Sequence, residues 1–466
     1  MDTTLELKQT DFLTNLHEST HRNYRKIEIA LRIIEALGAS LIVSTVALQL
    51  PSITLAITGA ALIVCVEVAL LALDLLGICK IDPKNHAFRE MKINHSSIYY
   101  EGNLPVVKIR ANTHKDAGFD YGFLTAPQIL KVIKRLNILV QLGYISITKE
   151  IKQQLEKVKS SVPEHHLDEI KGMVEGANLR LNEDSFWPSK VTFEDVVTLH
   201  MLPDLMHLAL APNCLFGCSV VTGKDEKTNK TGVARLLDWP ALGIGDKSCL
   251  INIKVGEEKQ LLLPSFPGCV GAITGVNKRL FCSINVTEPK EAIYDISEGV
   301  PSLFLNRLVL ENCEKVKDVQ EYIDYKNPQK RPAVPYHMFV ADDNDAEFYH
   351  FLQGDQKETF RRPIPHDDSA HFTLNCRHTS TSMPEKPNTM YYGESRYENI
   401  YKVWEQTKEL PLVERLKKVM KAPGVNNPMT VQAVMKMETT LVFSWDNSFA
   451  ANADKNVIFL DQEFEN

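Results

Sequence analysis

The feature that most constrains the fold is a change of hydrophobic pattern at Gly217-Cys218, near the middle of the chain. Upstream, residues 127–210 carry apolar side chains at spacings of three and four, which is typical of helices. Downstream, short β-prone runs predominate, and two helical segments interrupt them. Strands in adjacent runs with helices grouped between them predict an α+β fold rather than alternating βαβ units.

The individual elements are expected from the same periodicity. Helices are predicted over 128–142, 148–158, 164–177, 192–206, 302–323 and 394–405. Strands are predicted at 98–100, 106–109, 218–222, 232–237, 249–255, 260–263, 280–286, 336–341, 347–352, 370–376, 431–436, 440–445 and 457–460. A turn is expected at 118–122, and His165-His166 is expected on a solvated helix face.

Residues 36–66 contain no charged side chain, and the apolar stretch extends over 29–78. Pro51-Ser52 divides it into two segments, each close to the length of about 20 residues that spans a bilayer core as a helix. Three interpretations stay open: a membrane hairpin with both flanks on the cytosolic side, a buried helical hairpin, and a displaced signal sequence. Charged residues inside the two segments weigh against the membrane hairpin: Arg32, Glu35, Glu67 and Asp74.

Composition and cysteine spacing exclude some partners. The net charge of −7 over 466 residues argues against nucleic acid as a partner. Nine cysteines, an odd number, do not form a disulfide framework. Cys214 and Cys218 lack the further Cys or His partners of a structural zinc site, so neither a metal centre nor a cofactor is predicted.

Cys218 gains a distinct chemistry if the chain is cut directly before it. A free α-amino group has a pKa of about 7.7–8.0, so it can act as the base for the thiol of the same residue. Arg235 and Asp238, three residues apart, would hold this new terminus and lower the pKa of the thiol. This pattern predicts a precursor that is cleaved between Gly217 and Cys218.

Six motifs, in order, resemble one family of enzymes. They are Val162-Pro-Glu with Leu167-Asp-Glu-Ile-Lys-Gly172, Cys218-Ser-Val-Val with Arg235-x-x-Asp238-Trp239, Gly268-Cys-Val-Gly271 leading to Phe281-Cys-Ser-Ile-Asn285, Val300-Pro-Ser-Leu-Phe-Leu-x-Arg307, Phe372-Thr-Leu-Asn375, and Glu394-Ser-Arg396. Over about 85–460, the chain is similar to the choloylglycine-hydrolase superfamily of N-terminal-nucleophile (Ntn) hydrolases, which includes acid ceramidase, N-acylethanolamine acid amidase and penicillin acyltransferase.

The resemblance implies a four-layer αββα sandwich, which a helical segment and, outside the resemblance, a hydrophobic hairpin would precede. It divides the chain into an N-terminal extension (1–84), a pro-segment (85–217) and a catalytic chain (218–466), the last two being the α and β chains of one precursor. It also implies the site residues: Cys218 as nucleophile, Asn375 as oxyanion donor, Arg235, Asp238 and Arg396 around the thiol, and Trp239, Asn277 and Asn285 as substrate contacts.

The implied substrate is a small linear amide with an apolar acyl chain, such as a ceramide or an N-acylethanolamine, met in a membrane-associated, lysosome-like or secreted setting. Water would resolve the Cys218 thioester in a hydrolase, and an amine would do so in an acyltransferase. Leu236 and Val286 replace polar residues of the family pattern, and Ser219 is a milder change, so a decayed, membrane-attached scaffold stays an alternative. A papain-like Cys–His pair is another, and would need one of the following: His200, His207, His337 or His378.

Overall fold

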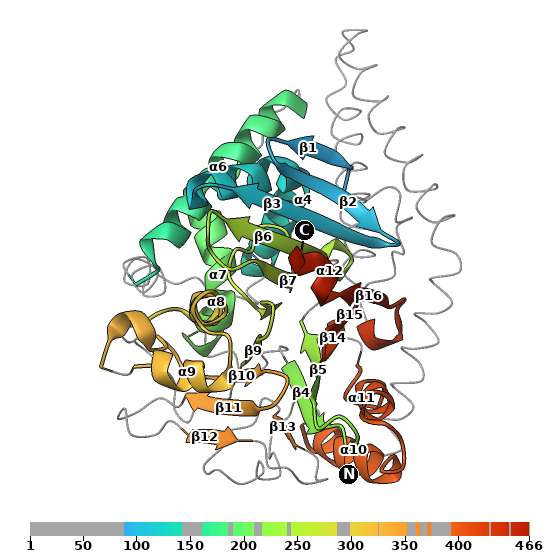
Figure 1. The fold of residues 1–466 in the computed structure, drawn as a ribbon. Helices are drawn as coiled ribbons and strands as arrows, with labels where there is room; N and C mark the ends of the chain where they lie inside the picture. Colours follow the sequence, from blue (N-terminus) through green and yellow to red (C-terminus); the bar gives the residue numbers. More distant parts are fainter. Residues whose placement is uncertain are drawn as a thin grey trace, which may run out of the picture. The chain divides into compact units, whose positions relative to one another are not determined.

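The chain folds into two β-sheets with helices and belongs to the α+β class, as predicted (Figure 1). The structure, a computed structural model, describes residues 88–141, 161–184, 190–208, 217–239, 244–286, 299–324, 326–351, 360–363, 371–373, 393–427, 430–446 and 449–465. Four predicted features lie outside these ranges: the apolar stretch 29–78, the helix 148–158, Asn375 and His378. Within the described ranges, no helix combines the length and the apolar character needed to cross a bilayer.

Within the described ranges, the larger sheet has ten strands in the order β1-β2-β3-β6-β7-β8-β9-β10-β11-β12. β3 and β6 pair in parallel, and the other neighbours pair antiparallel. The strands are β1 (Met91–Ile93), β2 (Ser96–Glu101), β3 (Leu104–Ala111), β6 (Cys249–Val255), β7 (Leu261–Ser265), β8 (Thr274–Val276), β9 (Phe281–Asn285), β10 (Tyr336–Ala341), β11 (Ala346–Phe351) and β12 (Phe360–Pro363).

The smaller sheet has six antiparallel strands in the order β13-β4-β5-β14-β15-β16. They are β13 (His371–Thr373), β4 (Gly217–Lys224), β5 (Thr231–Asp238), β14 (Thr430–Met437), β15 (Thr440–Trp445) and β16 (Asn456–Phe459). Three strand predictions match residue for residue, namely those for β6, β10 and β15. These strands have clear β-prone runs and well-marked ends.

The two sheets share one hydrophobic core. Successive side chains of a strand point to opposite faces, so one face of β4 and β5 contributes Val220 and Val233 to this core. The larger sheet contributes side chains from several strands, including Val106, Leu250, Leu262, Val276, Phe281, Phe339 and Phe348. The alternation that the sequence predicts therefore buries one face of each sheet against the other.

The second face of the smaller sheet is covered by α10 (Gly393–Gln406) and α11 (Leu412–Met420) (Figure 1). Leu236 of β5 packs in this second core with Trp404 and Leu416 of the two helices. Leu236, at the position where the family pattern predicts a polar residue, is therefore a buried core residue. The helix α11 was not predicted from the sequence.

The turn predicted at 118–122 is wrong, because these residues lie inside α4 (His114–Gln141), which packs along α6 (Glu164–Asp184). A Cβ added at Gly118 would lie 1.9 Å from the carbonyl oxygen of Glu169, and one at Gly172 would lie 2.0 Å from that of Lys115. The glycines therefore allow close approach of two helix backbones rather than a change of chain direction. α4 also packs against β3 of the larger sheet.

The single helix predicted at 302–323 is two helices, α8 (Ser302–Asn312) and α9 (Val316–Tyr322). The break has local polar causes. The Asp318 carboxylate accepts hydrogen bonds from the backbone N–H groups of Glu314 and Lys315, at 2.9 Å each. The Asp342 carboxylate accepts one from the backbone N–H of Val316, also at 2.9 Å. These bonds take backbone donors that a continuous helix would use internally.

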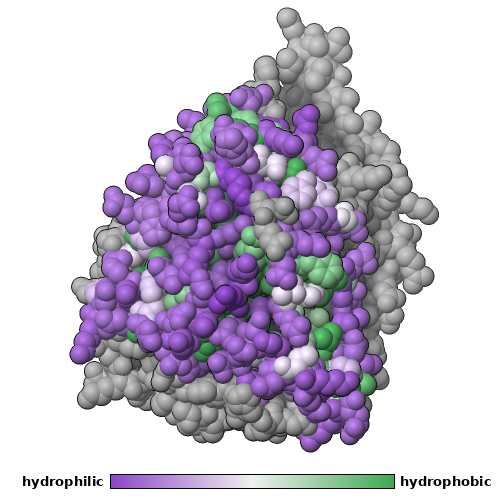
Figure 2. Space-filling model, in the orientation of Figure 1, coloured by the Kyte–Doolittle hydropathy of each residue, from purple (hydrophilic) through white to green (hydrophobic). Residues whose placement is uncertain are grey.

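Two further helices are α7 (Phe193–Leu208), close to the predicted one, and α12 (Leu460–Glu465), which was not predicted. On the face shown in Figure 2, most described surface residues are hydrophilic, and apolar residues occur in small groups among them.

Candidate active site

Cys218 is the second residue of β4, and its predicted partners lie on the neighbouring strand β5. In the strand register, Gly217 lies opposite Asp238 and Val220 lies opposite Arg235. The antiparallel pairing therefore brings three predicted site residues to one end of two adjacent strands. Their side chains are buried, with exposed fractions of 3% for Cys218, 0% for Arg235 and 4% for Asp238.

Arg235 approaches the thiol from the core between the two sheets. Arg235 is two residues after Val233 on β5, so its side chain leaves the strand on the same face as that of Val233, which points into this core. The Nη2 atom donates to Cys218 Sγ at 3.5 Å and to the backbone oxygen of Ile284, on β9, at 2.9 Å. The guanidinium group therefore places a permanent positive charge beside the sulfur and links the two sheets at this point.

Arg396 approaches the same strand ends from helix α10. Its Nη1 atom donates to Asp238 Oδ2 at 3.1 Å. The same atom also donates to Cys218 O and Ser219 Oγ, at 3.4 Å each. Asp238 Oδ1 accepts a hydrogen bond of 2.7 Å from Thr430 Oγ1. Asp238 is thus held on both of its oxygens, by a charged and a neutral donor.

Burial is the main cause that raises the pKa of the Cys218 thiol in the continuous chain. Arg235, a hydrogen bond from the Val286 backbone and Arg396 lower this pKa, whereas Asp238 raises it. The expectation that Arg235 and Asp238 lower this pKa concerns the cleaved chain; in the continuous chain Arg235 lowers it and Asp238 raises it, because a nearby carboxylate disfavours a thiolate. At neutral pH this thiol is protonated, so it needs a base before it can act as a nucleophile.

The residue before Cys218 has room for no side chain. A Cβ added at Gly217 would lie 2.8 Å from Asp238 Oδ2 and 3.1 Å from Arg396 Nη1. These distances are too short for ordinary contacts, so a larger residue would displace the ion pair of Asp238 and Arg396. The peptide bond that joins Gly217 to Cys218 is therefore enclosed by charged side chains on one side and by the thiol on the other.

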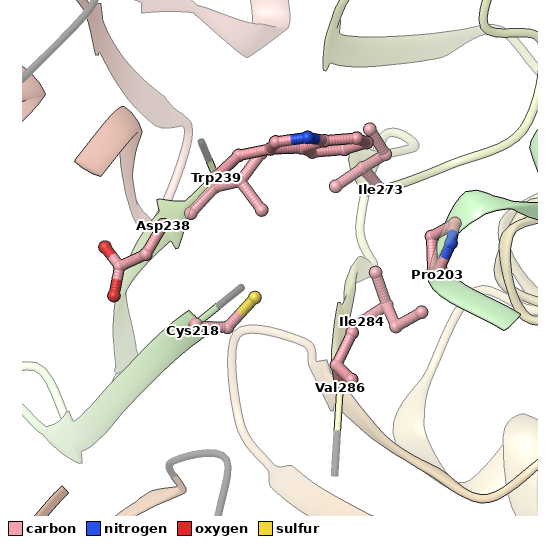
Figure 3. A pocket seen from close by; sticks show the side chains of 9 residues that line it. Pro203, Cys218, Asp238, Trp239, Ile273, Ile284 and Val286 are labelled. Carbon is pink, nitrogen blue, oxygen red and sulfur yellow. The ribbon is translucent and has the colours of Figure 1, made fainter. Parts of the chain in front are cut away.

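A narrow pocket, with a cavity volume of about 20 Å³, lies at the sulfur of Cys218. Figure 3 shows the sulfur pointing into a space that Trp239 borders on one side and Ile284 on another. Apart from Cys218 and Asp238, the lining consists of apolar residues and a glycine: Pro203, Gly217, Leu237, Trp239, Ile273, Ile284 and Val286. Such a surface suits an aliphatic group better than a charged one.

Trp239 lies where a substrate contact was predicted, and Asn277 does not. Trp239 lines the pocket and packs edge-on against Phe266, with ring centroids 5.7 Å apart. Asn277 donates to the backbone oxygens of Leu310 and Cys313, at 2.7 Å each. Its own side-chain oxygen accepts from backbone N–H groups of the turn that follows it. Asn277 therefore anchors the end of α8 and is not part of the pocket lining.

Asn285 is buried at the end of β9, directly before the pocket residue Val286. Asn375 lies outside the described residues. Two residues before it, Thr373 of β13 pairs with Val220, which is two residues after Cys218. Among the described residues, the structure brings four predicted ones together around Cys218, namely Arg235, Asp238, Trp239 and Arg396. It leaves Asn375, the predicted oxyanion donor, untested.

The histidines weighed for a Cys–His pair have other roles where the structure describes them. His200 lies between the backbone of Val196 and that of Val270, through hydrogen bonds of 2.7 and 2.6 Å. His337 lies against His350, with 2.9 Å between their Nδ1 atoms. No histidine is among the described residues that line the Cys218 pocket.

Some residues of the site carry no recognisable sequence signal. Thr430 is 192 residues from the carboxylate that it contacts. Pro203 comes from α7, upstream of Cys218, and Ile273 and Ile284 belong to the larger sheet or to the loop beside it. Apolar and hydroxyl residues are too common for their sequence positions to predict a shared pocket.

Comparisons with known proteins add no relatives to this description. No protein-family model matches the chain, and no curated protein matches it.

Proposed function

We propose that the chain is a self-processing cysteine amidohydrolase of the Ntn type, which cleaves the linear amide of an apolar acyl group. The observation that carries this proposal is the set of contacts at Gly217-Cys218. Arg235 faces the thiol at 3.5 Å, and the Asp238–Arg396 ion pair adjoins the residue before it. Burial of a thiol, two guanidinium groups and a carboxylate at one strand end costs desolvation free energy, and such clusters are typical of functional sites.

The order of layers supports the finer fold assignment, a four-layer αββα sandwich of the Ntn-hydrolase type. The two sheets share a core, α10 and α11 cover the outer face of the smaller sheet, and α4 and α8 pack against strands of the larger one. In such a sandwich the nucleophile would begin a strand of an inner layer, and Cys218 lies at the start of β4.

Self-processing begins with attack of the Cys218 sulfur on the carbonyl carbon of Gly217. The Asp238 carboxylate adjoins Gly217 on the side of the chain opposite the thiol, so we assign it and Arg396 to holding the scissile bond rather than to taking the thiol proton. The new C–S bond replaces the C–N bond, and the released nitrogen of Cys218 takes the proton. Water then hydrolyses the thioester, which leaves a carboxylate on Gly217, a free thiol and a free α-amine on Cys218.

The same atoms would then process the substrate. The α-amine of Cys218 takes the thiol proton as the sulfur attacks the amide carbonyl, and it returns the proton to the leaving amine. Arg235 stabilises the thiolate. We assign the oxyanion to the side-chain amide of Asn375, whose loss would slow turnover by about 10²–10³-fold. Water resolves the acyl thioester in hydrolysis, and an amine resolves it in acyl transfer.

The substrate class rests on the pocket lining and on the sequence. Trp239, Ile273, Ile284 and Val286 form an apolar surface next to the sulfur. Ceramides and N-acylethanolamines combine an amide with such an acyl chain. We further propose that residues 29–78 bring the enzyme to lipid, which would place the pocket near membrane-borne substrates.

The test is intact mass measurement with N-terminal sequencing of the purified protein, held at about pH 7 and at about pH 4.5–5, the latter near carboxylate pKa values. Two chains, one of which begins at Cys218, are expected from the wild type. Cys218→Ala should stay intact and inactive, whereas Cys269→Ala, a change at another buried thiol, should be processed normally.

The wild type and Cys218→Ala also separate the alternatives. Cleavage of Cys218→Ala at the same bond would disprove self-processing. An intact wild type that forms no acyl thioester would favour the non-catalytic scaffold. A processed enzyme that releases its acyl group only to an added amine would be an acyltransferase.

A further inference from the structure

A second polar cluster lies apart from Cys218, between helices α6 and α8. It contains His165 and His166 in the first turn of α6, and Glu311 in the last turn of α8. One ligand atom from each of these residues lies within 4.8 Å of those of the other two. This proximity could not be predicted from the sequence, because the two segments are about 145 residues apart.

His166 is the residue whose placement differs most from expectation. It was predicted on a solvated helix face, but its side chain is 0% exposed. The fold buries it against α8, where its Nε2 atom lies 3.1 Å from Glu311 Oε1. Its Nδ1 atom is also buried and has no hydrogen-bond partner among the described residues. Hydrogen bonding therefore accounts for only one nitrogen of this ring.

From this geometry we propose a zinc-type divalent metal site formed by His165, His166 and Glu311. The proposal is independent of the chemistry at Cys218. A tetrahedral ion with ligands at about 2.0–2.1 Å requires neighbouring ligand atoms roughly 3.4 Å apart. Each imidazole faces a different oxygen of Glu311, with 3.1 Å from His166 Nε2 to Oε1 and 3.6 Å from His165 Nε2 to Oε2, so small side-chain movements would bring three ligand atoms to this spacing.

The carboxylate of Glu311 is held in place by its neighbours. Arg307 Nε donates to Glu311 Oε1 at 2.8 Å and fixes the orientation of the carboxylate. Two imidazoles and one carboxylate are a ligand set that suits zinc.

A surface pocket gives an ion access to this cluster. Its lining includes His165, Glu311 and the acidic residues Glu257 and Glu258. With Lys259 also in the lining, the three glutamates still leave it net negative, which favours a cation, and water would complete the four-coordinate sphere. An ion bound here would tie α6, upstream of Gly217, to α8, downstream of it.

The experiment measures zinc binding by the full chain. After chelation and dialysis, the wild type should take up one Zn²⁺ per chain, read by elemental analysis, and its Tm should rise with Zn²⁺ concentration. His165→Ala should bind at least about tenfold more weakly. The side chain of His165 is 40% exposed, so this change leaves the core intact. His95→Ala, at an exposed histidine, is the matched control and should bind as the wild type does.

A cobalt titration distinguishes this cluster from the cysteines. Co²⁺ bound by two imidazoles and a carboxylate should give tetrahedral ligand-field bands without a thiolate charge-transfer band. A thiolate band, unchanged affinity in His165→Ala, or no uptake of Zn²⁺ by the wild type would each overturn the proposal. Because none of these measurements uses catalytic activity, failure of the proposed hydrolase function would not affect them.

Discussion

Two fully buried arginines, Arg235 and Arg307, use the same side chain in different ways. Arg307 donates from all three nitrogens: Nε to Glu311, Nη1 and Nη2 to the two oxygens of Glu169, and Nη1 also to Val270 O. Arg235 donates from Nη2 alone, to the thiol and to a backbone oxygen. Its Nε and Nη1 have no hydrogen-bond partner among the described residues.

The electrostatic surroundings differ in the same sense. The pKa of Arg307 is raised despite its burial, chiefly by Glu169, and the pKa of Glu169 is lowered to about 2. The pKa of Arg235 is lowered, because burial outweighs the nearby negative groups. A neutralised and fully bonded guanidinium holds a fold together, whereas one with unused donors beside a thiol can stabilise charge that develops there.

Arg307→Leu should therefore cost the most stability, about 3–5 kcal/mol, because it leaves Glu169 buried without its partner. Urea unfolding at pH 7 measures this loss. Arg235→Leu is the matched comparison and should cost less than half as much, while it abolishes processing at Gly217-Cys218. Equal losses of stability in the two variants would show that both arginines are structural.

Next in size is a pH effect at His200, which adjoins the Arg307 cluster through Val270. His200 Nε2 accepts the Val270 N–H, and burial lowers the pKa of His200 to about 4. The unfolded chain binds a proton near pH 6.5 and the folded chain does not, so stability falls as the pH falls from about 6.5 to 4. The expected loss between pH 7 and pH 4 is about 3 kcal/mol.

Urea unfolding of the wild type and of His200→Gln at both pH values isolates this contribution. The variant should be less stable at pH 7 and should lack about 3 kcal/mol of the wild-type pH dependence. His95→Gln, at an exposed position, should keep the wild-type dependence. If His200→Gln keeps it as well, another group causes the acid sensitivity.

How much of the structure could be predicted from the sequence depends on how far apart in the chain the interacting residues are. Alternating patterns predicted strands such as 440–445 because burial of one face requires them. The glycines of α4 were misinterpreted as a turn, since their cause is the backbone of α6. The break at 313–315 was missed because Asp342 supplies one of its hydrogen bonds from elsewhere in the chain.

The candidate site divides in the same way. Arg235 and Asp238 could be predicted, because their spacing on one strand places both beside Cys218 once β4 and β5 pair. Nothing in the pattern of Asn277 distinguished a helix anchor from a substrate contact. The bonding of the two arginines was also beyond prediction, since the partners of Arg307 come from both α6 and α8.

A smaller effect is expected from crowding at Gly217, which lies beside the ion pair of Asp238 and Arg396. Gly217→Val should cost about 2 kcal/mol and stop or greatly slow processing, because its side chain displaces Asp238 and Arg396. Gly223→Val is matched in crowding, since a Cβ there lies 2.8 Å from the Trp404 ring. It should lose similar stability but be processed normally, as seen by intact mass; slow processing in both variants would show a general packing defect.

The smallest effect concerns Thr430, the neutral partner of Asp238. Thr430→Val removes the 2.7 Å hydrogen bond to Asp238 Oδ1, at an expected cost of about 1.5 kcal/mol, because Arg396 still holds the other oxygen. Thr430→Ser keeps the hydroxyl and should cost much less. If Asp238 holds the Gly217-Cys218 bond in place for self-processing, the Val variant should be cleaved more slowly than the Ser variant in a time course by intact mass. Equal rates would mean that Arg396 alone positions the carboxylate, and the charged contacts around Cys218 would then suffice for the reaction.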